Sequence, residues 1–184
     1  MSEQLGTDRL FSYKLENVSL IISKIIESLI ENSEDIWKVL KYDSPNALEL
    51  DNLTYDEKLA LIDKGIITTK PNEIKIKLVP FSSGQILNDA MTEIRILDYN
   101  THYGDTIDTT QTFQLQILTH YTLWVLEGGN LRCNIIKKEL ISVLNQMRVD
   151  KVIGSLSFDN TNSSLQYWNG EFMGYTMNLH GIMG

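Results

Sequence analysis

The most constraining feature of this sequence is a change in the spacing of its apolar residues near residue 73. Before that point apolar residues recur every three or four positions, as on one face of an α-helix. After it they recur mainly at every second position, as in strands that bury one side. A chain that changes period in this way predicts an α+β fold, with helices packed on one face of a sheet.

Three helices are predicted in the first part of the chain. An apolar stripe at spacings of four, three and four predicts a helix over residues 17–31, formed by Val18, Ile22, Ile25 and Leu29. Ser33 is expected to cap a second helix that ends by Ser44, because Pro45 disfavours helical geometry before it. Thr54 and Glu57 have the spacing of a capping box and predict a third helix over about 55–64, ended by Gly65.

Strands are predicted near 74–79, 91–99 and 113–122, and the third can run on through Trp124 and Leu126. Between the second and third lies a polar stretch, 100–112, which we expect to be a mobile or functional loop. A helix over 131–147, with Asn130 as its N-cap, separates the third strand from two more segments, a strand at 152–158 and a long strand or strand pair at 165–179. Gly170 and Gly174 indicate a bulge or bend in the last of these.

These elements predict a mostly antiparallel sheet of about five strands, with N-terminal helices and one long helix between strands three and four packed on one face. We expect one domain over 1–184, in which 44–72 is a helical or loop insertion. A chain of 184 residues can bury a sufficient core without staples, and one cysteine excludes an internal disulfide framework.

Composition narrows the classes of partner. The net charge is −8, and the densest basic pairs are only Lys75 with Lys77 and Lys137 with Lys138. Tight binding of nucleic acid requires clustered Lys and Arg, so an acidic chain of this kind favours repulsion of DNA. No apolar run approaches the roughly 18 residues of a membrane span, and no signal peptide is recognisable. We therefore expect a soluble globular protein made in the cytoplasm, with no membrane partner.

The sequence offers few groups for catalysis, and we expect no enzymatic activity and no cofactor. It lacks phosphate-binding glycine loops and a nucleophile elbow. None of the three histidines pairs with another at metal-ligand spacing, so no metal site is expected. Cys133, at the start of a predicted helix, is interpreted as a packing residue rather than a nucleophile.

Aromatic residues concentrate in the second half of the chain and suit protein–protein contact. A long strand at a sheet edge must be paired, covered or charged, and pairing with a neighbouring subunit satisfies it. The residues that we predict to contact a subunit or partner are Tyr99, His102, Tyr103, Asp105, Asp108, Trp124 and Trp168.

The order of these segments resembles the neck and tail-terminator (tail-completion) proteins of long-tailed bacteriophages. The resemblance spans about residues 15–180 and is carried by patterns of apolar and polar residues, without a catalytic signature. Its segments are the N-terminal helix, 34–45, 92–96, 113–117 with 120–124, and the helix after Leu131 and Arg132. The segment 48–70 is longer than in the smallest members of that group.

The resemblance implies a structural virion protein that forms a homohexameric ring at the head–tail junction, terminates the tail tube and joins it to the neck. Its partners would be neighbouring neck and tail-tube proteins, with genomic DNA passing through the lumen unbound. A head-closure or adaptor neck protein is one alternative. A tail-tube protein fits less well, because the chain begins with some fifty helix-prone residues. A third, of another class, is a small enzyme or ligand-binding domain centred on His102, Asp105 and Asp108, or on His120.

Overall fold

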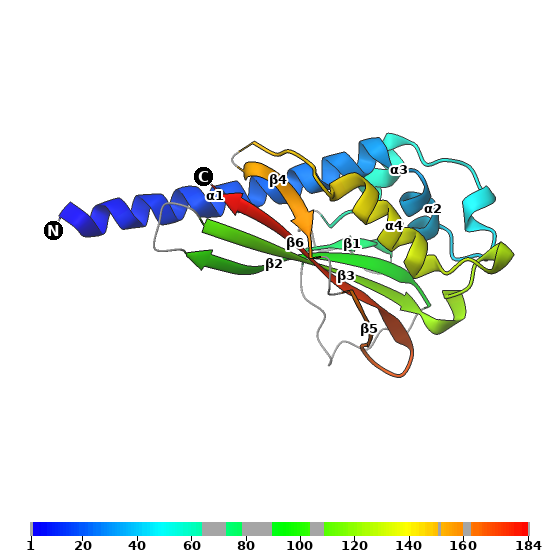
Figure 1. The fold of residues 1–184 in the computed structure, drawn as a ribbon. Helices are drawn as coiled ribbons and strands as arrows, with labels where there is room; N and C mark the ends of the chain where they lie inside the picture. The colour runs from blue at the N-terminus through cyan, green and yellow to red at the C-terminus, as the bar shows by residue number, and fades with distance from the viewer. Residues whose placement is uncertain are drawn as a thin grey trace.

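The computed structural model describes residues 2–63, 73–78, 90–103, 109–150, 152–159 and 163–183. It confirms the α+β class: four helices and three short 3-10 turns accompany a six-stranded sheet in the described residues. The helices lie on one face of the sheet, and the N-terminal half of α1 projects past its end (Figure 1).

The helices are α1 (Ser2–Asn32), α2 (Asp35–Lys41), α3 (Tyr55–Ala60) and α4 (Arg132–Leu144). α1 begins fifteen positions before the predicted start at residue 17, although the predicted stripe is confirmed by burial of Val18, Ile25 and Leu29. α3 has the predicted capping box at Thr54 and Glu57 but ends at Ala60, and Gly65 lies outside the described residues.

The strands are β1 (Ile76–Lys77), β2 (Thr92–Tyr103), β3 (Thr109–His120), β4 (Val152–Phe158), β5 (Ser164–Tyr167) and β6 (Phe172–Met183). Their order is β1-β2-β3-β6-β4, and β5 pairs with β6 beside β4. All pairs are antiparallel except β1 with β2, which is parallel. The sheet is therefore mixed, because apolar alternation shows that a segment is a strand but not which way its neighbour runs.

The main core lies between the helices and the sheet. In register, Ile94 on β2 faces Ile117 on β3, and Leu115 faces Met177 on β6. The fully buried members of the main core include Ile21, Ile25, Leu29, Trp37, Leu40, Ile94, Phe113, Leu115, Ile117, Ile136, Leu140 and Leu179.

The predicted loop over 100–112 is wrong throughout its described residues, 100–103 and 109–112. β2 continues to Tyr103 and β3 begins at Thr109, so Asn100 pairs with Thr112 and Tyr103 with Thr109. A register shift between Asp98 and Asn100 marks a bulge at Tyr99. The hairpin forms although its arms carry no apolar alternation, because strand pairing bonds the backbone whatever the side chains are.

The predicted continuation of the third strand through Trp124 is also wrong. β3 ends at His120, whose side chain accepts a hydrogen bond from Thr122 N, and a 3-10 turn follows over Tyr121–Leu123. The N-cap of α4 is Leu131 and makes no side-chain bond, so Asn130 is not the cap. Its carbonyl oxygen instead accepts from Leu126 N at 2.7 Å.

Candidate functional site

The sheet has a second face, turned away from the helices, which carries mainly polar side chains. On β2 this face holds Glu93 and Arg95, which pair in register with Leu118 and Gln116 of β3, and Gln114 of β3 lies on the same face. On β6 the corresponding residues are Thr176, Asn178 and His180. The predicted one-sided alternation therefore describes the two sides of the sheet, of which the apolar one packs on the helices.

Three charged residues on the second face form a buried ion cluster. Glu93 Oε2 lies 2.5 Å from Lys77 Nζ, and Glu93 Oε1 lies 2.6 Å from Arg95 Nη2. Glu93 and Arg95 are completely buried, and Lys77 is nearly so. A buried carboxylate is tolerated only when cations compensate its lost hydration. The predicted basic pair Lys75 and Lys77 therefore serves the interior and offers little positive charge to a nucleic acid.

Lys75 is also buried, and it lies beside a pocket of about 280 Å³. Its Nζ is 3.7 Å from Asp43 Oδ2, and burial lowers the pKa of the Lys75 ammonium. The lining residues are Lys41, Asp43, Ala60, Leu61, Glu73 and Lys75. Two lysines and two carboxylates balance each other, so the pocket has no net charge with which to select an ion.

A polar network continues along the second face. Gln116 Nε2 donates to Gln114 Oε1 at 2.8 Å, and Thr176 Oγ1 donates to Gln166 Oε1 at 2.8 Å. At its end Thr112 Oγ1 lies 2.9 Å from His180 Nδ1, and His180 Nε2 lies 3.0 Å from Asp159 Oδ2. His180 was not predicted from the sequence as a site residue, because its partners come from two other segments that the fold brings together.

Cys133 on α4 is buried, and its thiol donates to Thr119 Oγ1. Burial raises the pKa of the Cys133 thiol to about 12, so the nucleophilic thiolate is not formed near neutral pH. This agrees with the predicted packing role.

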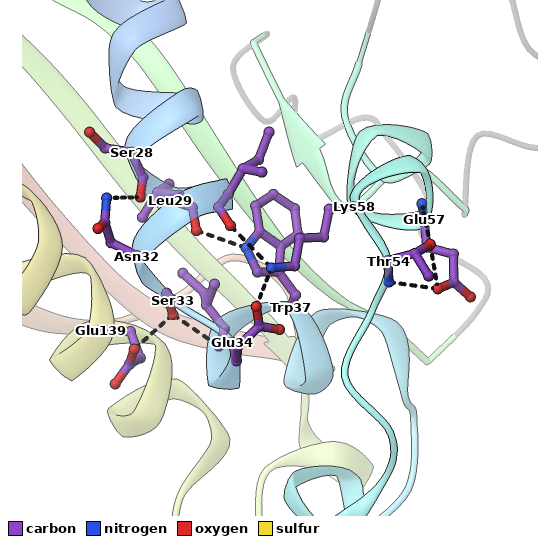
Figure 2. Close-up of polar contacts among 12 residues, drawn as sticks. Ser28, Leu29, Asn32, Ser33, Glu34, Trp37, Thr54, Glu57, Lys58 and Glu139 are labelled. Carbon is purple, nitrogen blue, oxygen red and sulfur yellow. Dashed lines mark hydrogen bonds and ion pairs between the residues drawn. The ribbon is translucent and has the colours of Figure 1, made fainter.

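The junction of the first three helices is held by side chains that bond the last carbonyl groups of α1 (Figure 2). Asn32 Nδ2 donates to Ser28 O, Trp37 Nε1 to Leu29 O, and Lys58 Nζ to Ile30 O, at 3.0, 2.9 and 3.0 Å. Lys58 Nζ also pairs with Glu34 Oε1 at 2.5 Å. The last four carbonyl groups of a helix lack partners within it, so the bonds to Leu29 and Ile30 complete the end of α1.

Ser33 joins this junction to α4. Its hydroxyl donates to Glu139 Oε2 at 2.7 Å and accepts from Ile36 N at 3.4 Å. The predicted capping contact is therefore present, although the residue at the N-cap position of α2 is Glu34.

A small second core lies under the β5–β6 hairpin, on the second face. It consists of Met91, Leu118 and Phe172, with Trp168 packed against it. The ring of His120 lies 5.2 Å from Phe172 and 4.6 Å from Tyr121, in centroid distances. Because Tyr121 is 55% exposed, this aromatic cluster reaches from the second core to the surface.

Exposed apolar side chains gather along β5. Leu165 is 45% exposed and Tyr167 is 72% exposed, and both stand on a strand that carries no charged residue. An uncharged edge strand with exposed Leu and Tyr is typical of a contact surface. We name Ser164–Tyr167 the β5 edge and take it as the candidate functional site.

The predicted contact residues are not gathered in one place. Tyr99 is 59% exposed at the bulge in β2, whereas Trp124 is half-buried against the main core and Trp168 half-buried on the second core. His102 and Tyr103 lie on β2, but their side chains are outside the described residues, as are Asp105 and Asp108. The sequence signal that could have found the β5 edge is the uncharged run Ser-Leu-Gln-Tyr before a glycine turn.

Within the described ranges, no group of three or more His, Cys, Asp or Glu side chains is placed to hold a metal ion. Among the described helices, none combines the length and hydropathy that crossing a bilayer requires.

The fold is therefore that of an α+β protein, and the feature of its surface that suits contact with a partner is the uncharged β5 edge with exposed Leu165 and Tyr167. The YomW family model matches residues 33–180, so the chain belongs to the YomW family. No curated protein matches the sequence significantly.

Proposed function

We propose that this protein is a structural component of a tailed-bacteriophage virion. It forms a ring at the head–tail junction that terminates the tail tube and joins it to the neck. The observation that carries the proposal is the β5 edge, where Leu165 and Tyr167 are exposed without a covering element in the described residues. A protein whose work is contact with other subunits needs such a surface and needs no reactive centre.

The charge of the chain supports the same proposal. Its lysines at 75 and 77 are buried with carboxylate partners, and the net charge is −8. A ring lined by such subunits repels phosphates, so DNA passes through the lumen without being held. The protein would be made in the host cytoplasm and reside in the virion.

Immunogold labelling of purified particles tests the location. We expect one label position per particle, at the head–tail junction, and mass spectrometry should detect the chain in the same particles. Absence of the chain from purified particles, or label along the whole tail, would overturn the proposal.

A head-closure or adaptor protein of the neck is distinguished by the particles that form without the gene. Loss of a tail terminator leaves tube growth unchecked, so tails of irregular length are expected. Loss of an adaptor leaves tails of uniform length that fail to join heads. Tails of irregular length would support tail termination, and unjoined tails of uniform length would instead support a head-closure or adaptor role.

An enzyme is a second candidate, favoured by the Thr112–His180–Asp159 arrangement. A hydroxyl, an imidazole and a carboxylate in this order are the groups of a nucleophile, a base and an orienting acid. A panel of ester and amide substrates tests it with wild-type protein and His180→Ala. Turnover that the substitution abolishes, in a chain whose circular dichroism is unchanged, would favour the enzyme.

A further inference from the structure

The chain closes most of one outer edge of its sheet with its own backbone. On β4, Leu156 O accepts from Gln146 N and Leu156 N donates to Met147 O, both at 2.8 Å. Phe158 N is bonded to the side chain of Asn145, at 3.3 Å from Oδ1. The segment after α4 therefore acts as a partner for β4, and that part of the edge is satisfied.

The β5 edge, on the same side of the sheet, is not closed in this way. Trp168 N donates to Phe172 O at 3.0 Å. Backbone groups of an antiparallel strand point to its neighbour at every second residue, so Gln166 and Ser164 also bond β6. The backbone groups of Leu165 and Tyr167 therefore point away from the sheet. In the described part of the chain no backbone group bonds those outward positions. Both residues are exposed, and the strand has no charge or proline to discourage pairing.

The described residues likewise close the opposite edge of the sheet over only part of its length. β1 pairs with Ile94 and Arg95 of β2, and Ile94 N donates to Lys75 O at 2.7 Å. The residues of β2 from Thr92 to Leu97 are buried, whereas Asp98, Tyr99 and Asn100 are exposed. After the bulge, the arm Asn100–Tyr103 is four residues long and carries no Asp, Glu, Lys or Arg. We name this stretch the β2 arm.

We propose that the β5 edge of one copy pairs with the β2 arm of the next copy, so that the sheets of neighbouring subunits join. The two stretches match in length and in their lack of formal charge, and they lie on opposite edges of one sheet. Contact between opposite edges is head-to-tail, and repetition of a head-to-tail contact closes a ring when its rotation permits. This inference rests on the proposed function and names the interface that the ring would use.

The tyrosines beside the two stretches support a second copy as the occupant. Tyr167 is 72% exposed on the β5 edge, and Tyr99 is 59% exposed next to the β2 arm. Pairing would bury apolar surface from both while the backbone groups of Leu165 and Tyr167 gain partners.

Site-specific cross-linking of the full chain tests the pairing. The double variant Asn100→Cys with Tyr167→Cys is treated with a short bis-maleimide, and products are separated under denaturing conditions. Cys133 does not interfere, because its thiol is buried and protonated. We expect a ladder of covalent oligomers from the double variant, a dimer from an equimolar mixture of the single variants, and no product from either single variant alone.

Dimers from one single variant alone would show a symmetric contact and overturn the inference. The mass of the uncross-linked wild type, measured by light scattering, separates a failure of the edge pairing from a failure of the proposed ring. A wild type that assembles while the double variant gives no ladder would overturn the edge pairing but not the ring. A wild type that stays monomeric at every concentration, with no ladder, would overturn both.

A surface substitution supplies a second readout. Tyr167→Lys should lower the assembled mass or weaken assembly at least tenfold, because lysine on an edge opposes strand pairing. The matched control is Tyr55→Lys on α3, which changes a tyrosine of similar exposure, 62%, away from both edges. An equal effect of the two substitutions would contradict the assignment.

Discussion

Arg132 on α4 donates a hydrogen bond from Nη1 to the carbonyl oxygen of Val39 on α2, at 2.5 Å and across 93 positions of sequence. The same guanidinium donates to Tyr42 O at 2.9 Å, to Ser44 O at 2.8 Å and to Leu123 O at 2.9 Å. Burial lowers the pKa of Arg132, but an arginine remains charged at any physiological pH. One side chain therefore completes the end of α2 and fixes the turn after β3.

Replacement of this arginine should be among the most destabilising single changes. Arg132→Lys keeps the charge but cannot donate to four carbonyl groups at once, and Arg132→Met leaves them all unpaired. We expect losses in the free energy of unfolding of about 3 kcal/mol for lysine and more for methionine. Urea denaturation followed by tryptophan fluorescence measures both, and a loss below about 1 kcal/mol for methionine would show that the bonds contribute little.

The ion cluster on the second face predicts unequal effects for its members. Glu93 is the one carboxylate of the cluster and pairs with both cations, whereas Lys77 supplies only one of the two positive charges that balance it. Glu93→Gln removes the negative charge beside two buried cations and should cost about 3–5 kcal/mol in the free energy of unfolding. Lys77→Met leaves the Glu93–Arg95 pair intact and should cost less. Denaturant curves for the two variants give the ranking, and the reverse order would contradict it.

Two glycines near the β5–β6 turn should respond differently to alanine. A Cβ on Gly174 would lie 1.8 Å from Ile117 O and 3.3 Å from Trp168 Cζ3, whereas a Cβ on Gly170 would meet nothing within 4 Å. Because the first clash is with backbone, β3 and β6 would have to separate. Gly174→Ala should therefore cost about 3 kcal/mol or more, while Gly170→Ala should change stability by less than about 0.5 kcal/mol. Thermal unfolding of the matched pair tests this.

The buried thiol predicts a loss of stability in alkali. The pKa of Cys133 is about 12 in the folded chain, compared with about 8.5 in an unfolded one. Because the folded-state pKa is raised, this contribution to stability is complete below pH 8.5 and is lost as the pH rises toward 12. The slope is at most about 1.4 kcal/mol per pH unit.

The control for the thiol is Cys133→Ala, which removes the titrating group. Its stability curve above pH 9 should be flatter than that of the wild type, although it starts lower because a small cavity is left. A thiol reagent should label the folded wild type only at the rate of unfolding. Rapid labelling at pH 8 would contradict the burial of Cys133.

Features that depend on neighbouring residues could be predicted from the sequence. The stripe of α1, the capping box of Thr54 and Glu57, and the alternation in β3 each involve residues within a few positions of one another. Local hydrogen bonds and one-sided burial dictate these elements, so the α+β class and the position of α4 followed from them.

The candidate site could be predicted only in part. An excess of aromatic residues indicated a contact surface, but the fold decided which of them are exposed: Tyr167 reaches solvent, whereas Trp124 packs on the main core. Likewise the extension of β2 and β3 into the polar hairpin arms had no side-chain signal, because the ladder bonds that form it are made by the backbone.

Period and capping act over one or two turns of chain, so the helices, the main strands and the sides that they bury follow from neighbouring residues. Long-range packing sets the rest: β1 runs parallel to β2, Glu93 meets Lys77 and Arg95 in the interior, and Arg132 reaches Val39. The same packing sets which sheet edges the described residues leave open. Such partners lie far apart in sequence, and which of the possible pairings forms depends on the packing of the whole sheet against its helices.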